Sequence, residues 1–353
     1  MLKQLKGRRY PLSATFDLTE RCNLACVHCY INQPGASQSA RARELTTAQI
    51  AALLDQMADA GSLFVSLTGG EVLLRPDFPE IYRYARQLGM LVNVFTNGTL
   101  LTADIADLLA ASRPLSVDVT LYGATAEAYE RVTRVPGSYE RCRRGIKLAL
   151  ERGLPLSLKA VVLTANRHEL PAMRALADDL GVKFRYDGLV WPRLDGGQQP
   201  LQYRLPVEEV AALDGEVPER MQAWAEQARL FKGQSIRAEY VYSCGAGFRS
   251  FHVDSGGLLS VCTMSRRRAY DLLQGSFLQG WEALGAVTRE KRQLDTACRT
   301  CEVGPLCMQC PGWSQAVHKD DETPVEFVCA LGRMRATRIG RPISEMIGGD
   351  KRG

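Results

Sequence analysis

Residues 11–30 read PLSATFDLTERCNLACVHCY, and they join a strand-like run to a cysteine-rich loop. The run PLSATFDL predicts a buried β-strand, and Cys22, Cys26 and Cys29 follow it within eight positions of one another. The next cysteine along the chain is Cys142. Three thiols on one short loop can converge on an inorganic centre, but they leave a four-ligand site one ligand short. The loop therefore predicts a metal centre with an open coordination position.

Length and composition describe an ordinary globular chain. Of the 353 residues, 46% are hydrophobic and 24% are charged, which is enough to build a sizeable core. The formal charge of +5 is small for this length, so we expect no nucleic-acid partner. No segment resembles a signal peptide or the ~20 apolar residues of a membrane span, so we expect a cytoplasmic protein with no membrane partner. In that reducing compartment, eleven cysteines point to metal or redox chemistry rather than to disulfides.

Strand-like and helix-like runs alternate as far as about residue 190. Further strands are expected at 63–67, 91–96, 115–122, 155–163 and 182–188, and helices at 46–61, 76–89, 102–112, 138–153 and 168–181. Thr46 is expected to cap the first of these helices and Gly61 to end it. Six β-to-α steps predict an α/β fold with a parallel sheet curled into a partial (β/α)6 TIM-like barrel. Polar and glycine-bearing motifs follow the strands, at the end of the sheet where barrel active sites are built.

The composition changes after the barrel. We assign residues 1–190 to the barrel, 191–240 to a bridging region with one or two helices, 241–335 to a small second domain and 336–353 to a C-terminal tail. Prolines and glycines in WPRLDGGQQP interrupt the alternation at the start of the bridge. Seven of the eleven cysteines lie between 244 and 329, which predicts a metal-dense domain.

Zinc is the alternative occupant of the first cysteine loop. Cys22, Cys26 and Cys29 together with His28 would make a Cys₃His zinc site. His28 is, however, the immediate neighbour of Cys29, and adjacent residues rarely reach the same tetrahedral centre. An iron–sulfur cluster is therefore favoured.

The spacing Cys22-x₃-Cys26-x₂-Cys29, followed by TGGE at 68–71, resembles the radical S-adenosylmethionine (radical SAM) superfamily. The resemblance covers residues 12 to about 190. It implies a 4Fe–4S cluster held by the three cysteines, with S-adenosylmethionine (SAM) on the fourth iron. It also implies reductive cleavage of SAM to a 5′-deoxyadenosyl radical, which abstracts a hydrogen from the substrate.

The resemblance further implies which residues contact SAM. Gly69 and Gly70 would bring the backbone close to the methionine moiety, and Glu71 would hold its ammonium group. The other implied contacts are His28 or Tyr30 beside the adenine, Thr120 at the ribose, and Asn97 and the backbone near Leu163 at strand ends. An ordinary turn or strand role is the alternative for each of these. Family members often have an aspartate where Tyr122 stands.

The cysteines of the second domain resemble the SPASM extension of radical SAM enzymes, which holds two auxiliary 4Fe–4S clusters and would bring the total to three. A zinc ribbon would account for only four of the seven cysteines. By resemblance, the outer cluster takes Cys298, Cys301, Cys307 and Cys329, and the inner cluster takes Cys244, Cys262 and Cys310. The inner cluster would keep an open iron or take another ligand, such as Glu239 or a substrate atom. Two residues, where the family has three, separate Cys307 from Cys310, and Thr263 replaces the acidic base of sulfatase-maturing members.

Members with this extension mostly modify ribosomally made peptides by crosslinking, thioether formation, oxidation or epimerisation. The alternatives are radical oxidation or epimerisation of a small molecule such as an antibiotic sugar, and a non-catalytic iron–sulfur electron-transfer protein. Only about ten residues precede the first strand, so a peptide substrate would need a separate leader-binding protein or would dock directly. A flavodoxin or ferredoxin is the expected electron donor. Cys142, in the helix at 138–153, is expected to be a buried inert thiol; the alternative is a hydrogen-atom donor.

Overall fold

A curved parallel sheet forms the body of the protein. The computed structural model describes residues 9–31, 33–230 and 239–340. The parallel strands, in spatial order, are β1 (Ser13–Thr19), β4 (Phe64–Gly69), β5 (Leu91–Thr96), β6 (Ser116–Thr120), β7 (Leu156–Val161) and β8 (Lys183–Asp187). These six strands occur where the alternation predicts them, and the predicted partial-barrel α/β fold is confirmed.

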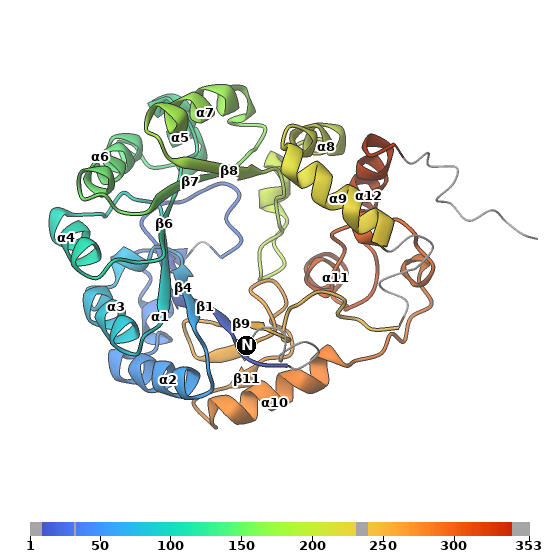
Figure 1. Cartoon of the computed structure of the whole chain (residues 1–353), viewed down its shortest axis with the longest axis horizontal. Helices are drawn as coiled ribbons and strands as arrows, with labels where there is room; N and C mark the ends of the chain where they lie inside the picture. Colours follow the sequence, from blue (N-terminus) through green and yellow to red (C-terminus); the bar gives the residue numbers. More distant parts are fainter. Residues whose placement is uncertain (1–8, 32, 231–238, 341–353) are drawn as a thin grey trace, which may run out of the picture.

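Helices cover the outer side of this sheet (Figure 1). The helices of this half of the chain are α1 (Gln38–Ala42), α2 (Thr47–Asp59), α3 (Phe78–Gln87), α4 (Ala103–Ala111), α5 (Ala126–Thr133), α6 (Ser138–Glu151) and α7 (Leu170–Asp179). Helix α5 was not expected from the sequence; it begins after a Thr125 cap and ends at Thr133, and the left-handed residue Arg134 follows it. No helix in the described ranges is long and apolar enough to cross a membrane.

Local signals explain where α2 begins and ends. The Thr46 side chain accepts a hydrogen bond from the Gln49 backbone, and the Gln49 side chain in turn accepts one from the Thr46 backbone. This reciprocal capping box satisfies two backbone donors that the first turn of a helix leaves without partners. Gly61 follows the helix with a φ of +90°, a conformation that glycine adopts at little cost.

The two faces of the sheet differ in character. The residues that face the helices are apolar and at most 1% exposed; they include Val65, Leu67, Val92, Val94, Val117, Val119 and Leu158. The alternate residues on the inner face are largely polar, among them Thr68, Asp118 and Lys159. The core therefore lies between sheet and helices, and the inside of the barrel is left for a binding site.

The second half of the chain continues the same sheet. Its elements are α8 (Val207–Gly215), α9 (Pro218–Leu230), β9 (Ser250–Val253), β10 (Leu258–Ser260), β11 (Tyr270–Asp271), α10 (Phe277–Thr288), α11 (Pro311–His318) and α12 (Glu326–Arg338). A separate two-residue ladder joins β2 (Arg21–Cys22) to β3 (Gln33–Pro34). Strand β9 pairs in parallel with β1, so the order of the nine-stranded sheet is β11-β10-β9-β1-β4-β5-β6-β7-β8. Residues 231–238 of the bridging region and 341–353 of the predicted tail lie outside the described residues.

A buried charged group joins β1 to β9. Asp17 and His252 are both fully buried, and His252 Nε2 lies 2.9 Å from Asp17 Oδ2. Arg266 Nη2 donates to the same carboxylate oxygen at 2.8 Å. Burial opposes the charge on Asp17, but His252 and Arg266 outweigh it and lower the pKa of this carboxyl. These contacts bind the loop after Cys262 to the first strand of the barrel.

Candidate functional site

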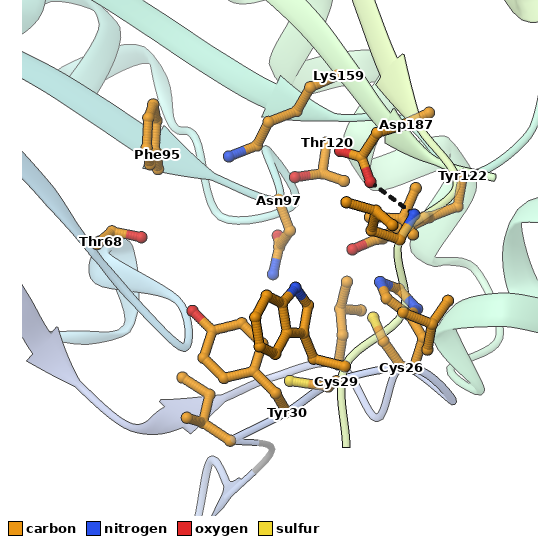
Figure 2. A pocket seen from close by; sticks show the side chains of 18 of the residues that line it. Cys26, Cys29, Tyr30, Thr68, Phe95, Asn97, Thr120, Tyr122, Lys159 and Asp187 are labelled. Atoms are coloured by element: carbon orange, nitrogen blue, oxygen red, sulfur yellow. Dashed lines mark hydrogen bonds between the residues drawn. The ribbon is translucent and has the colours of Figure 1, made fainter. Parts of the chain in front are cut away.

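A cavity of about 630 Å³ opens inside the barrel at the carboxyl ends of its strands (Figure 2). The sequence-predicted residues that line it are Cys22, Cys26, His28, Cys29, Tyr30, Gly69, Gly70, Asn97 and Thr120. The thiols come from the loop after β1, whereas the last four residues come from the ends of β4, β5 and β6. The fold thus brings together two groups of residues that are separated by about 40 to 100 positions in the sequence.

Backbone hydrogen bonds hold the cysteine loop in place. The N–H groups of Ala25 and Val27 donate to the carbonyl groups of Thr133 and Val132 at 2.9 and 3.0 Å. Both acceptors lie at the end of α5, where a helix leaves its last carbonyl groups without internal partners. Helix α5, which sequence analysis missed, therefore positions the thiol loop.

A buried ion pair supports the same loop from its other end. The Arg21 guanidinium donates to both carboxylate oxygens of Glu44, at 2.7 and 2.9 Å, and the two side chains are 9% and 7% exposed. A two-point contact of this kind restricts both side chains in orientation as well as in distance. It fixes the residue directly before Cys22.

The three thiols suit a metal cluster. Burial raises the pKa of Cys22 to about 12 and that of Cys26 well above its usual value. Such thiols stay protonated unless a cation lies beside them, and metal binding deprotonates them. Across the described ranges, no three Cys, His, Asp or Glu side chains group closely enough for a single metal ion. The ligands of a 4Fe–4S cluster bind separate iron atoms, and thiolates are the ligands it takes.

Backbone packing leaves room only for glycine at positions 69 and 70. A Cβ at Gly69 would lie 2.1 Å from the carbonyl oxygen of Thr19, and one at Gly70 would lie 2.2 Å from that of Arg21. The Gly70 N–H donates to the Thr19 carbonyl at 2.7 Å. Bare glycine therefore lets β4 approach the start of the cysteine loop while both residues still line the cavity.

Glu71 does not line the cavity. It is fully buried, and its carboxylate accepts hydrogen bonds from the Thr96 hydroxyl at 2.6 Å, the Asn97 N–H at 2.7 Å and the Leu73 N–H at 3.1 Å. Burial raises the pKa of Glu71 against the effect of these donors. Glu71 joins the ends of β4 and β5, and the contact with the ammonium group of SAM that the resemblance implies stays a prediction.

Asn97 connects the end of β5 to the cysteine loop. Its Nδ2 donates to Asn23 Oδ1 at 2.9 Å and to Cys22 Sγ at 3.7 Å, and its Oδ1 accepts from Thr99. Donors to a ligating sulfur tune the reduction potential of an iron–sulfur cluster. Asn97 therefore acts on the thiol as well as lining the cavity.

His28 presents an uncharged ring to the cavity. Burial lowers the pKa of this imidazole to about 4, and its Nδ1 atom has no hydrogen-bond partner among the described residues. The ring meets Tyr122 edge to face, with centroids 5.0 Å apart. A neutral aromatic ring with a vacant polar atom is suited to contact a flat heterocycle.

Leu163 is fully buried and is not among the residues that line the cavity. Its N–H donates to Asn166 Oδ1 at 2.7 Å, and its carbonyl accepts from the N–H groups of Asn166 and Arg167. This backbone is already paired within its own turn. Val161, two residues earlier, lines the cavity instead.

Sequence reasoning missed the charged residues of the cavity. Lys159, Arg185, Asp187 and Arg220 line it, together with Phe95 and Trp191. The only hint of these charged residues in the sequence was a single lysine, Lys159, within the apolar strand run PLSLKAVVL. Which face of the strand it occupies depends on the register of the sheet, and the run itself does not show that.

The seven cysteines between residues 244 and 329, a region called the second segment from here on, include two groups. Cys310 interacts electrostatically with Cys262 and Cys244, and these three form one group. Cys329 interacts with Cys307 and Cys298 in the other. Cys301 packs against the hydrophobic cluster that contains Val303 and Leu306. The assignment of these cysteines to two auxiliary clusters stays a prediction. Glu239 pairs with Lys291 at 3.1 Å.

Two tryptophans connect the cavity to this second segment. Trp191 lines the cavity and stacks on Trp313 with ring centroids 3.7 Å apart. Trp313 lies in the first turn of α11, the helix that begins directly after Cys310. The two sites are therefore joined through packed side chains.

Cys142 lies outside both groups. It is fully buried in α6, and its thiol points at the Thr120 carbonyl at 3.9 Å. Burial raises its pKa to about 12. It does not line the cavity, which is the position that a hydrogen-atom donor would need.

Comparison with known proteins agrees with the geometry. The sequence model of the Radical SAM superfamily matches residues 16–177. The chain is 27% identical over 330 residues to the AdoMet-dependent heme synthase of Methanosarcina barkeri, covering 88% of this chain and 94% of that protein. It is 36% identical over 167 residues to the PqqA peptide cyclase of Xanthomonas euvesicatoria, covering 47% of this chain and 44% of the relative. This chain thus aligns with less than half of the peptide cyclase.

The fold is also that of a solved structure. Streptococcus suis SuiB bound to S-adenosylmethionine aligns with a TM-score of 0.68 at 16% identity, covering 88% of this chain and 76% of SuiB. The alignment extends well beyond the barrel. The cysteine loop, the glycine pair at the end of β4 and the match over residues 16–177 agree, and this part of the chain is a radical SAM domain.

Proposed function

We propose that this chain cleaves SAM reductively at the Cys22–Cys26–Cys29 site and modifies a ribosomally made peptide. The observation that carries the proposal is the placement of these three thiols in one cavity with Gly69 and Gly70. With the cluster and SAM bound, the cofactors supply a 5′-deoxyadenosyl radical that abstracts a substrate hydrogen. Peptide chemistry is supported by the 36% identity to a PqqA peptide cyclase.

The chain's own residues provide the positioning. The cysteine loop, fixed by α5 and by the Arg21–Glu44 pair, would hold the cluster. His28 offers a neutral ring for the adenine, and Thr120 offers a hydroxyl at the end of β6. Glu71 acts as a positioning residue because it orients Asn97. A flavodoxin or ferredoxin would supply the electron, and a separate leader-binding protein would present the peptide.

A small molecule is the second candidate substrate. The alignment with the heme synthase runs along 88% of the chain, whereas the alignment with the peptide cyclase covers only 47%. A relative that matches the second segment as well as the barrel shares the part of the chain expected to contact substrate. A tetrapyrrole is the compound class that this relative indicates.

The test is anaerobic incubation of cluster-loaded protein with SAM and dithionite. We expect 5′-deoxyadenosine and methionine as products. Protein with a full iron complement that forms no 5′-deoxyadenosine would contradict the proposal. Deuterium transferred into 5′-deoxyadenosine from a labelled precursor peptide or from a labelled porphyrin distinguishes the two substrate classes.

We also propose that the two cysteine groups of the second segment hold auxiliary 4Fe–4S clusters. The grouping of Cys244, Cys262 and Cys310, apart from Cys298, Cys307 and Cys329, supports two separate centres. Cys301 completes the outer set by the resemblance stated above.

Iron content tests this assignment. Three clusters correspond to about twelve irons per chain. Replacing Cys298, Cys301 and Cys307 with alanine is expected to remove about four of them while SAM cleavage stays measurable. About four irons in the unaltered protein, with bound zinc, would show that the second segment is a zinc domain.

A further inference from the structure

Lys159 projects into the cavity without a carboxylate partner. It extends from β7 and lies across the cavity from Cys29 and Tyr30 (Figure 2). Its Nζ is 3.8 Å from the centre of the Phe95 ring. Within the described part of the chain, this ammonium makes no hydrogen bond or ion pair.

The nearby carboxylates are held by other donors. Asp118 accepts hydrogen bonds from the hydroxyl groups of Ser116 and Ser157 and pairs with Arg185. Glu71 has the three donors already described. Asp187 accepts the Leu189 N–H at 2.9 Å and lies beyond ion-pair distance of Lys159. None of the three neutralises the lysine by direct contact.

This arrangement is unfavourable while the cavity holds no anion. The pKa of Lys159 is lowered to about 8, chiefly by burial and also by Arg185, against the opposing effects of Asp118, Glu71 and Asp187. Lys159 is half-buried, and an ammonium that has lost part of its hydration without gaining a contacting anion is disfavoured. The face of an aromatic ring holds a cation in place but compensates only in part. A carboxylate brought to Nζ would complete the site.

We propose that Lys159 binds a carboxylate group of the substrate. The substrate class is thus an acid: a peptide with an acidic side chain or free C-terminus at this position, or a carboxylic acid of smaller size. Lys159 pairs across the sheet with Thr120 and with Arg185, so it is level with the residue expected at the ribose of SAM. A carboxylate held there would place the substrate beside the radical source. This proposal rests on the proposed function.

SAM itself carries a carboxylate on its methionine moiety. A carboxylate of the cofactor and a carboxylate of the substrate must therefore be distinguished. Two comparisons do this: SAM with decarboxylated SAM, and N-acetylglycine with N-acetylglycinamide. The first pair differs only in the carboxylate of the cofactor. The second pair represents a substrate with and without a terminal carboxylate.

The readout is the rate at which formaldehyde and a borane reductant methylate Lys159 in the unaltered, cluster-loaded protein, followed by peptide mass spectrometry at pH 8. Exposed Lys147 in the same sample is the internal control. An anion at Nζ that raises the pKa by one unit lowers the neutral fraction from about half to about a tenth, which slows the reaction about fivefold. The assay needs no turnover, so it remains informative if SAM cleavage is not observed.

We expect N-acetylglycine to slow methylation of Lys159 in the SAM-bound protein, with N-acetylglycinamide inactive and Lys147 unaffected. Lack of protection by N-acetylglycine would overturn the proposal. Protection by SAM but not by decarboxylated SAM, with no further effect of N-acetylglycine, would also overturn it and assign Lys159 to the cofactor. Equal slowing at Lys147 would reveal a general effect of the additive on the reagent and count against a site.

Discussion

Replacing Cys26 with alanine is expected to abolish formation of 5′-deoxyadenosine. The thiol is one of three that face the same cavity, and no other cysteine among the described residues lines it. Loss of an outer-shell partner alone typically costs about 10- to 100-fold in metal affinity or activity, so loss of a ligand should cost more. The measurement combines the anaerobic product assay with iron content, which should fall by about four per chain.

Cys142→Ala is the matched control for this variant. It makes the same Cys-to-Ala change at a fully buried position in α6 that does not line the cavity. We expect about 1 kcal/mol of lost stability from the small void, with iron content and product formation retained. A Cys26→Ala protein that keeps its iron and its activity would show that the cluster lies elsewhere.

Replacing Gly70 with alanine is expected to disrupt the cysteine loop through backbone contact alone. The added Cβ would lie 2.2 Å from the carbonyl oxygen of Arg21 and 2.8 Å from that of Glu20. Neither atom can move without displacing the chain that leads to Cys22. Overpacking of this kind typically costs about 1–3 kcal/mol, and we expect the upper end of that range in denaturant unfolding, together with loss of iron from the first site.

Gly256→Ala is the control for the added methyl group. A Cβ at Gly256 would meet its nearest neighbours, Arg43 and Asp254, only at 3.5 Å, which is ordinary contact. We expect its stability and iron content to match those of the unaltered protein within about 0.5 kcal/mol. If Gly70→Ala behaves in the same way, the close approach of β4 to the cysteine loop does not restrict this position.

The barrel strands and the cysteine loop were readable from local sequence because their signals are local. Apolar runs of strand length, Thr46 before α2 and Gly61 after it each act within a few residues. The thiol spacing is likewise contained in eight positions. Short elements escaped this reading: α5 has eight residues, and β9 has only four.

Pairing between residues far apart in the sequence determined the features that local sequence did not indicate. Strand β9 joins β1 across more than 230 positions, and the buried Asp17–His252 pair exists only because of that register. Glu71 bonds to residues at the end of β5, whereas Lys159 faces the cavity. In the sequence, each is only a charged residue within or directly after an apolar run. A residue's place on one face of a strand alternates with every position, so the curvature and register of the sheet decide which side chains meet. Those quantities depend on the packing of the whole chain, and for this reason the sequence indicated a three-thiol metal site whereas only the folded barrel showed the lysine opposite it.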